Sequence, residues 1–494
     1  MKERIVKIGK IAVPEKVIAV CAVAAFLALL YPLIKLAHYS APWYDDYSYG
    51  VHVKRFLAEE RSFGSAMRGA LYVTRTWWYC WQGTFSSIFM MALMPAAFGE
   101  QYYEIGLIAI LLVFVLGSTL LVKVLAKHLL KAKMSMQLIL MVIVSATMVE
   151  LIYTAQQGLY WYNAAVHYTF MHGCMFLLTA AAIKVLYARK IPSAVIFMIL
   201  AGFLSFVCGG SNYATCLQGI IILVTVTGLG LLFKNKKSWM LLPPIAVYGW
   251  ALYYNMSAPG NRVRGAYYQG YGPIKSILYS FKSAAENTWK FSGMITIVIL
   301  LFSVPFLWNA VKKLDFKFKL PGLITLYSFG LYASGFTSSY YAMGNAGLSR
   351  TWIVIKYTFQ LLLFINEAYW LGWLAKKLEQ KGKVITDLKY YWGYFVAFAG
   401  GVLLSFHFEI NQVGSYSSYG AFYYITTLEA GIFYEEYNAR IDAIQNGGPV
   451  VEVAPYIIRP WFTCKGELST DPNAEQNRAM AEFYRKEAIY ISQE

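Results

Sequence analysis

Charged residues are scarce for a chain of this length. Asp, Glu, Lys and Arg make up 14% of the 494 residues, whereas a soluble protein carries about 25%. Hydrophobic residues reach 58%, and the mean hydropathy is +0.47. This balance excludes a soluble globular protein of ordinary composition and predicts a polytopic membrane protein.

Cysteines are also few, and none is placed for a metal or redox site. The six cysteines form no CxxC pair, and no metal-ligand spacing is present. Most of them lie within apolar runs, as small core residues do. Cys80 and Cys464 lie outside these runs and are predicted on the same face, so whether they pair is left open.

Acidic residues are outnumbered, which gives a net charge of +17. The Lys and Arg residues occur as short clusters between apolar runs rather than as a stripe on a soluble domain. That distribution is the positive-inside pattern of membrane proteins. The sequence therefore predicts a lipid bilayer as partner and no nucleic acid. It also lacks the internal repeat that marks many secondary transporters.

Long apolar runs, in contrast, are abundant. If every Lys-rich connection is cytoplasmic, they predict an all-α bundle of about eleven transmembrane helices. The N-terminus would be cytoplasmic and the C-terminus extracytoplasmic. The predicted spans are 17–36, 105–124, 136–153, 168–186, 191–208, 214–233, 240–254, 292–309, 320–336, 352–374 and 391–406.

These spans define a membrane module, 1–406, and a small extracytoplasmic α(+β) domain, 407–494. Residues 37–104 form a long first outer loop. Its apolar run, 85–98, is shorter than the roughly 20 residues that a spanning helix needs. We therefore predict an interfacial or re-entrant helix there, because a true span would invert the rest of the topology.

Two adjacent carboxylates, Asp45 and Asp46, follow the first predicted span. Aromatic residues of the kind that settle at a membrane interface surround them. The two acids are thus predicted at the depth of lipid headgroups, where an enzyme would act on a lipid-linked phosphate. An ordinary helix cap is the alternative. The surrounding aromatics are Trp43, Tyr44, Tyr47 and Tyr49.

Other polar residues are predicted on the same membrane face. A carboxylate there could serve as general base to an acceptor hydroxyl, and arginines could stabilise a departing phosphate. Each also has a structural alternative: the arginines could anchor to headgroups, Glu150 could pair with an arginine, and His167 could be a structural hydrogen-bonding residue. The candidates for substrate binding are Trp161, Tyr168, His167, Asn212, Asn261 and Glu150, and the candidate phosphate ligands are Arg264, Arg350 and Arg262.

The chain resembles the GT-C superfamily of membrane glycosyltransferases. The resemblance rests on Asp45-Asp46 directly after the first span, on the many spans and on the outer C-terminal domain. It is closer to a largely uncharacterised bacterial GT-C-like group. The features shared with that group are Trp161 with Tyr168, Ala258-Pro259-Gly260-Asn261-x-x-Arg264 and the late outer Arg350.

The resemblance implies an enzyme of the bacterial plasma (inner) membrane. It would transfer a sugar from a polyprenyl-phosphate donor to a cell-envelope glycan or lipid-linked saccharide, with inversion. Asp45 would be the preferred base, with Asp46 orienting it or holding a divalent cation (Mg²⁺ or Mn²⁺). Arg264 and Arg350 would hold the carrier phosphate, with Arg262 as an alternate. A surface-polysaccharide polymerase or ligase, and a flippase of lipid-linked sugars, stay open as alternatives.

Overall fold

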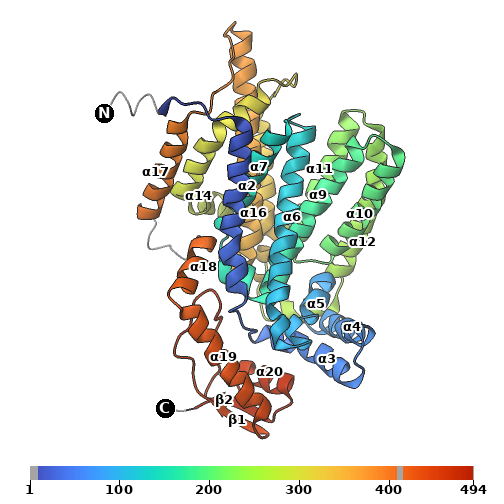
Figure 1. Cartoon of the computed structure of the whole chain (residues 1–494). Coiled ribbons are helices and arrows are strands. Elements are labelled where there is room, and N and C mark those ends of the chain that lie inside the picture. Colours follow the sequence, from blue (N-terminus) through green and yellow to red (C-terminus); the bar gives the residue numbers. More distant parts are fainter. Residues whose placement is uncertain (1–8, 409–415, 493–494) are drawn as a thin grey trace.

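The computed structural model describes residues 9–408 and 416–492. Within these ranges the chain is almost entirely helical, and one small sheet lies near the C-terminus (Figure 1). The helices form an elongated bundle with a smaller domain at its lower end in the view of Figure 1. Several of them are able to span a membrane by length and composition, so the protein is an all-α multi-pass membrane protein.

The bundle helices overlap all eleven predicted spans. They are α2 (Glu15–Ala37), α6 (Tyr103–His128), α7 (Met134–Glu150), α9 (Met171–Tyr187), α10 (Ile191–Gly209), α11 (Tyr213–Leu232), α12 (Leu242–Met256), α14 (Pro273–Val311), α15 (Pro321–Met343), α16 (Ser349–Gln380) and α17 (Trp392–Phe408).

Among the described helices, six are long and apolar enough to cross a membrane. The count of about eleven spans therefore stays a prediction. The six qualifying ranges are Glu15–Ala37, Glu100–His128, Tyr162–Tyr187, Ile191–Gly209, Tyr213–Leu232 and Pro273–Val311.

The first outer loop folds at the lower end of the bundle (Figure 1). It contains α3 (Asp45–Glu59), α4 (Phe63–Cys80) and α5 (Phe85–Ala92), followed by the short helices η1 (Pro95–Ala97) and η2 (Glu100–Tyr102). Because α5 has eight residues, it is too short to cross a bilayer. The prediction that the run 85–98 does not span is confirmed.

Between α7 and α9 the helix breaks and re-forms. Two π-helical turns, η3 (Gln156–Tyr160) and η4 (Val166–Phe170), flank the short α8 (Tyr162–Ala165). Trp161 between them is extended, with φ −102° and ψ 106°. π-Helical turns are rare and occur frequently at functional sites, and here they line the lower end of the bundle.

Close backbone approaches hold the bundle together. A Cβ on Gly117 of α6 would lie 2.4 Å from the carbonyl oxygen of Gly173 on α9, so glycine at both positions lets these helices touch, as small residues do in membranes. In α14, Gly293 adopts φ 60° and breaks the helix between its outer half and its apolar half.

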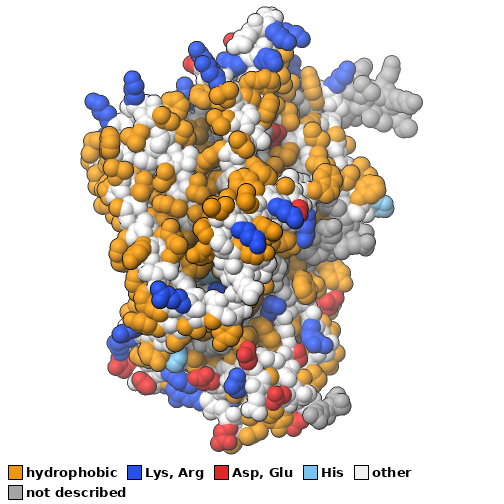
Figure 2. Space-filling view, turned by 180° about the vertical axis from the view of Figure 1, so that it is seen from behind, with side chains coloured by type: hydrophobic (Ala, Val, Ile, Leu, Met, Phe, Trp, Pro, Cys, Tyr) orange, Lys and Arg blue, Asp and Glu red, His pale blue; other side chains and the backbone are white. Residues whose placement is uncertain are grey.

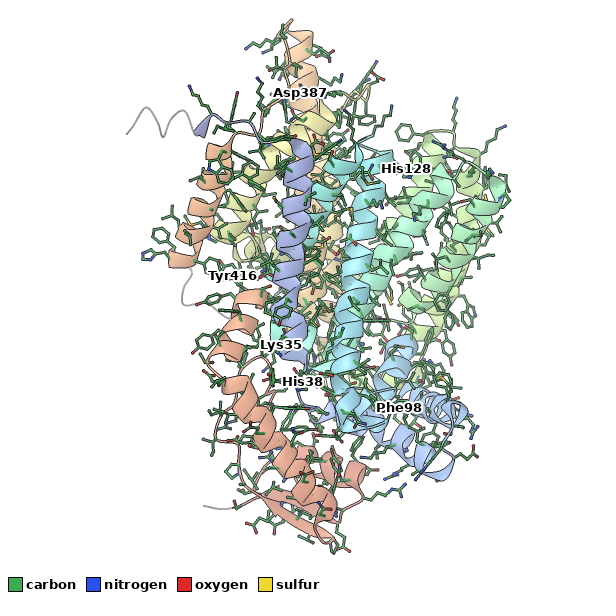
Figure 3. All side chains as sticks on the ribbon, viewed as in Figure 1. Lys35, His38, Phe98, His128, Asp387 and Tyr416 are labelled. Carbon is green, nitrogen blue, oxygen red and sulfur yellow. The ribbon has the colours of Figure 1, made fainter. Side chains whose placement is uncertain are left out.

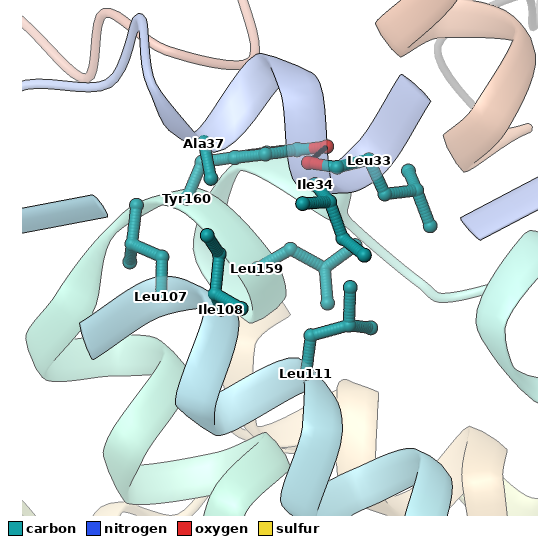
Figure 4. Close-up of a pocket in the computed structure, with 8 residues that line it drawn as sticks. All are labelled: Leu33, Ile34, Ala37, Leu107, Ile108, Leu111, Leu159 and Tyr160. Carbon is teal, nitrogen blue, oxygen red and sulfur yellow. Dashed lines mark hydrogen bonds between the residues drawn. The ribbon is translucent and has the colours of Figure 1, made fainter. Parts of the chain in front are cut away.

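The surface carries the signature of a membrane protein. Figure 2 shows hydrophobic side chains over most of the middle, Lys and Arg side chains at both the upper and the lower end, and most of the acidic side chains at the lower end. Apolar side chains from α2, α6 and η3 also close most of the space between those elements. A residual crevice of about 10 Å³ is left there (Figure 4), lined by Leu33, Ile34, Ala37, Leu107, Ile108, Leu111, Leu159 and Tyr160.

The domain at the lower end is built from the last part of the chain. It contains α18 (Ser417–Thr426), α19 (Glu429–Asn446), β1 (Val450–Val453), α20 (Glu475–Tyr484) and β2 (Ala488–Ile491). The two strands are parallel, with Val450 opposite Ala488 and Val453 opposite Ile491, and α20 lies in the crossover between them. We call this unit the outer domain. The remaining short helices of the chain are η5 (Lys236–Leu241) and α13 (Pro259–Gly265).

Candidate functional site

The two adjacent carboxylates occupy different environments. Asp46 is fully buried. Its Oδ2 accepts hydrogen bonds from the Trp43 backbone N–H at 2.9 Å and the Tyr103 hydroxyl at 2.9 Å, and its Oδ1 accepts one from the Asn163 backbone N–H at 2.9 Å. Burial raises the pKa of Asp46 to about 7, while these three donors oppose the rise. Asp46 thus joins α3, α6 and α8.

Asp45, in contrast, is half-buried and has no hydrogen-bonding or ion-pair partner for its carboxylate among the described residues. Burial raises its pKa above the ordinary value, and the positive charges of Arg350 and Lys465 lower it. Glu475 raises it further. Asp45 is therefore the free carboxylate of the pair, and it lies within the field of two cations.

Local backbone geometry fixes the direction of Asp45. Tyr44, directly before it, adopts φ 26° and ψ −82°, a sparsely populated conformation that costs about 1–3 kcal/mol. The Tyr44 hydroxyl donates to Glu475 Oε2 of the outer domain at 2.7 Å. Asp45 and Asp46 then occupy the first turn of α3, where the helix dipole favours negative charge.

Arg350 and Lys465 flank one aromatic ring. The Arg350 guanidinium carbon is 5.6 Å from the Trp161 ring centroid, and Lys465 Nζ is 5.5 Å from it. Neither cation has an ion pair or hydrogen bond with another side chain in the described part of the protein. Trp161 is buried, and its indole N–H lacks a partner there as well. Burial and Arg350 both lower the pKa of Lys465, while Asp45 raises it.

Arg264 approaches the same region from α13. Its Nη1 donates to Gln82 Oε1 at 2.6 Å, and its guanidinium lies 5.6 Å from the Trp81 ring centroid. Arg264 and Arg350 both act electrostatically on Tyr49 and on His167. Tyr49 also lies in the field of Asp45, so one carboxylate and three cations converge here. We call Asp45, Arg264, Arg350, Lys465 and Trp161 the charged site.

The Ala258-Pro259-Gly260-Asn261 motif has a structural role. The Asn261 amide oxygen accepts from the Tyr213 hydroxyl at 2.7 Å and the Gly83 N–H at 3.1 Å, and its nitrogen donates to the carbonyl oxygens of Asn255 and Met256. A Cβ on Gly83 would lie 1.8 Å from the Asn255 oxygen. The motif therefore holds α13 against the end of α4, which places Arg264 beside Gln82.

The other predicted site residues divide into those near the charged site and those that support it. His167 Nδ1 lies 2.8 Å from Ser87 Oγ, and the Tyr168 hydroxyl accepts from Thr351 Oγ1 at 3.4 Å. Asn212 caps α11 and donates to the His167 carbonyl oxygen at 2.6 Å, so its amide supports the η4 turn. Arg262 is exposed and lies outside the charged site as defined above.

Glu150 is used elsewhere. Its Oε2 accepts from the Ser418 backbone N–H at 3.1 Å, and its Oε1 accepts from the Ser418 hydroxyl. These bonds attach α18 of the outer domain to the end of α7. Both oxygens of Glu150 are thus engaged by the outer domain, and contact between Glu150 and a substrate stays a prediction. Ser418, rather than the arginine expected as an alternative, is the partner of Glu150 in the described part of the chain.

Sequence reasoning did not find Lys465. Lys465 belongs to a loop of the outer domain that is bonded to the bundle directly before it. The Gln156 side-chain amide donates to the carbonyl oxygens of Trp461 and Cys464, at 2.5 and 3.1 Å. A Cβ on Gly466 would lie 2.6 Å from the Trp43 ring. The sequence signal was weak, since Lys465 is one lysine in a polar segment. Gln82 was missed for the same reason.

A buried ion pair holds the Lys465 loop in shape. Arg440 Nη1 lies 2.7 Å from Glu467 Oε1, with both side chains almost fully buried. Arg440 also donates to the Ala454 carbonyl oxygen at 2.6 Å, and the Tyr456 N–H donates to Glu467 Oε2 at 2.7 Å. Because the charges are paired and their remaining donors and acceptors are used, this pair is structural.

The acid pair does not offer the ligand set of a divalent cation. Both oxygens of Asp46 already accept hydrogen bonds, which leaves Asp45 alone. No group of three or more His, Cys, Asp or Glu side chains suited to a metal occurs within residues 9–408 and 416–492. Over the same ranges Cys80 and Cys464 are both free thiols, and Cys80 is exposed while Cys464 is buried.

Comparison with protein-family models, curated proteins and solved structures finds no match for this chain in any of the three. The class that the fold defines is a multi-pass membrane protein.

Proposed function

We propose that this protein is a membrane glycosyltransferase that moves a sugar from a polyprenyl-phosphate donor to an extracytoplasmic glycan or lipid-linked saccharide. One observation carries the proposal: Asp45, Arg350 and Lys465 converge at one end of the bundle without ion-pairing to any described residue. Half-buried charges without partners are costly. A bound phosphate would supply the negative charge that Arg350 and Lys465 lack, and a bound hydroxyl would give Asp45 a proton to accept.

The proposed step is a single displacement. The Asp45 carboxylate accepts the proton of an acceptor hydroxyl as that oxygen attacks the anomeric carbon of the donor. The bond between this carbon and the phosphate oxygen breaks, and the phosphate leaves with the electron pair. Arg350, Lys465 and Arg264 stabilise the charge that develops on it. Displacement from the opposite side inverts the anomeric configuration.

The environment of Asp45 suits a general base. Burial raises its pKa, and a base whose pKa is moved from the ordinary value toward neutrality accepts a proton more readily. Asp46 is the less suitable base, because its oxygens are occupied by the donors that anchor α3. We therefore assign the base to Asp45 and a positioning role to Asp46.

The position of the charged site favours an enzyme over a flippase of lipid-linked sugars. A flippase is expected to distribute charged groups along a path through both leaflets, whereas these groups lie at one end of the bundle. A polymerase or ligase of surface polysaccharides would also use outer arginines, but it does not require a free carboxylate beside them.

A transfer assay tests the proposal. Purified protein would be incubated with a panel of polyprenyl-phosphate sugars and envelope glycan acceptors, alongside Asp45→Asn. We expect transfer by the native protein and a 10²- to 10⁴-fold lower rate in the variant, which is the usual contribution of a general base. Transfer at the native rate by folded Asp45→Asn would contradict the assignment of the base.

A pair of matched arginine variants separates phosphate binding from general surface charge. Arg264→Ala removes a cation of the charged site, whereas Arg262→Ala removes an exposed cation two residues away on the same short helix. We expect Arg264→Ala and Arg350→Ala to raise KM for the donor and lower kcat/KM by about 10²-fold. Arg262→Ala should leave both values unchanged, and an equal effect of all three would argue for a headgroup anchor.

A further inference from the structure

A second cavity, which shares no lining residue with the charged site, lies where the end of α3 and the start of α4 meet the end of η1. It has a volume of about 530 Å³ and is lined by Lys54, Leu57, Ala58, Arg61, Ser62, Phe63, Ala97 and Phe98. The volume is in the range of small-molecule sites, roughly 300–1,000 Å³. Its lining includes two cations and no acid.

Both cations lack a counter-ion. Lys54 Nζ lies 3.8 and 4.3 Å from the ring centroids of Phe483 and Tyr484, and neither Lys54 nor Arg61 forms an ion pair with a described residue. Burial lowers the pKa of Lys54 to about 8, Glu100 opposes this fall and Arg485 adds to it. At neutral pH Lys54 is therefore a positive charge whose burial is only partly compensated.

Three acids near the cavity have partners of their own. Glu482 pairs with Arg55 at 2.7 Å, and Glu60 pairs with Arg68. Glu100 accepts hydrogen bonds from the hydroxyls of Tyr437 and Tyr484, at 2.7 and 2.5 Å. None of these acids lines the cavity, so an anion that enters it meets the positive charges of Lys54 and Arg61 and no carboxylate.

The rim of the cavity is apolar and lies at the boundary of the membrane. Phe63 is 75% exposed and Phe98 is 41% exposed. Phe98 lies two residues before the candidate span Glu100–His128, and Figure 3 shows it at the lower end of that helix. Exposed aromatic side chains beside unpaired cations at this depth match the two parts of a lipid: an anionic headgroup and the start of its acyl chains.

We propose that this cavity binds the phosphate headgroup of an anionic phospholipid. Lys54 and Arg61 contact the phosphate, and Phe63 and Phe98 contact the glycerol and the first acyl carbons. The cavity is lined by one edge of α3, the helix that carries Asp45 at its start. The proposal is independent of the transfer reaction, because binding is measured without a donor or an acceptor.

Native mass spectrometry of the purified full-length protein tests the proposal. The protein would be titrated with phosphatidylglycerol, with phosphatidylcholine and with soluble glycerol 3-phosphate, each against Lys54→Met/Arg61→Gln. About 1 kcal/mol per basic residue near a lipid surface corresponds to a Kd for phosphatidylglycerol about 30-fold higher in the double variant. Phosphatidylcholine, which has no net charge, should bind the native protein more weakly than phosphatidylglycerol does.

Two further variants keep the outcome clear if the double variant does not fold. Arg61→Gln alone changes an exposed side chain, so folding should be preserved and the Kd should rise about fivefold. Arg75→Gln removes an exposed cation from α4 that does not line the cavity, and it should leave the Kd unchanged. Equal phosphatidylglycerol binding by native protein and Arg61→Gln would overturn the proposal, as would equal losses in Arg61→Gln and Arg75→Gln. Glycerol 3-phosphate binding as tight as that of the lipid would show that the cavity takes a soluble phosphate instead.

Discussion

At the scale of single residues, two neighbours of identical chemistry take different roles because of their surroundings. Asp45 and Asp46 differ in how many donors each carboxylate meets: none for Asp45 and three for Asp46. A helix turns by about 100° per residue, so adjacent side chains at the start of α3 must face different neighbours. One faces the charged site, and the other faces the packed end of the bundle.

Asp46→Asn should therefore cost stability rather than chemistry. An amide keeps one acceptor oxygen and turns the other position into a donor, which leaves at least one buried N–H or O–H group without an acceptor. We expect a loss of about 1–3 kcal/mol in the free energy of unfolding, measured as a lower Tm in detergent. Asp45→Asn is the control and should keep the native Tm, since its carboxylate has no such partners. Equal Tm values for both variants would contradict the structural role of Asp46.

Lys465 should set the pH dependence of the reaction through Asp45. Lys465 and Arg350 lower the pKa of Asp45, so removing the lysine charge raises that pKa. The base is active only when deprotonated, and the acidic limb of the kcat/KM profile should move to higher pH in Lys465→Met. Lys465→Arg, which keeps the charge, should preserve the native limb. A limb that does not move in Lys465→Met would show that the lysine lies outside the field of the base.

At the scale of elements, the charged site depends on contacts that only glycine allows. Gly83 and Gly260 let the end of α4 and the start of α13 touch: a Cβ on Gly260 would lie 2.4 Å from the Trp81 nitrogen. Arg264 follows one turn later on α13 and reaches Gln82. The motif around Asn261 thus acts on the charged site through Arg264.

Gly83→Ala should displace α13 and, with it, Arg264. Overpacking of this kind costs about 1–3 kcal/mol, and the donor KM should rise as the guanidinium moves. Gly265→Ala, at the end of the same helix, is the matched control because its Cβ would meet open space. Thermal unfolding and donor KM would be measured for both. A native KM in Gly83→Ala would show that the site does not depend on this contact.

At the scale of the whole molecule, the outer domain is part of the candidate site. Ser418 attaches it to Glu150, Glu475 to Tyr44 and Glu482 to Arg55. These contacts join residues more than 250 positions apart in the sequence. They hold the domain that carries Lys465 against the bundle.

The predicted orientation can be measured with a native cysteine. Cys80 is exposed at the end of α4, on the face that we predict to be extracytoplasmic. A membrane-impermeant maleimide should label it in intact cells, and Cys80→Ser should abolish most of that labelling. The other exposed cysteine in the described residues, Cys21, lies within the candidate span α2, where we expect lipid to shield it from the reagent. Labelling that requires broken cells would reverse the topology.

The sequence determined the features that depend on local composition. Apolar runs predicted the bundle helices, and the shortness of the run 85–98 predicted the non-spanning α5. Each follows from hydrophobic transfer and helix geometry, which act over a few turns. The glycosyl-transfer chemistry and the count of spans stay predictions.

Tertiary structure decided which polar side chains are free. Asp46, Glu150, Asn212 and Asn261 look like site residues in the sequence, but their hydrogen-bonding capacity is used by distant backbone and side-chain groups. Lys465 looks ordinary, yet a long-range contact through Gln156 brings it beside Asp45. Whether a polar group is satisfied depends on partners supplied by other elements, and local sequence does not contain that information.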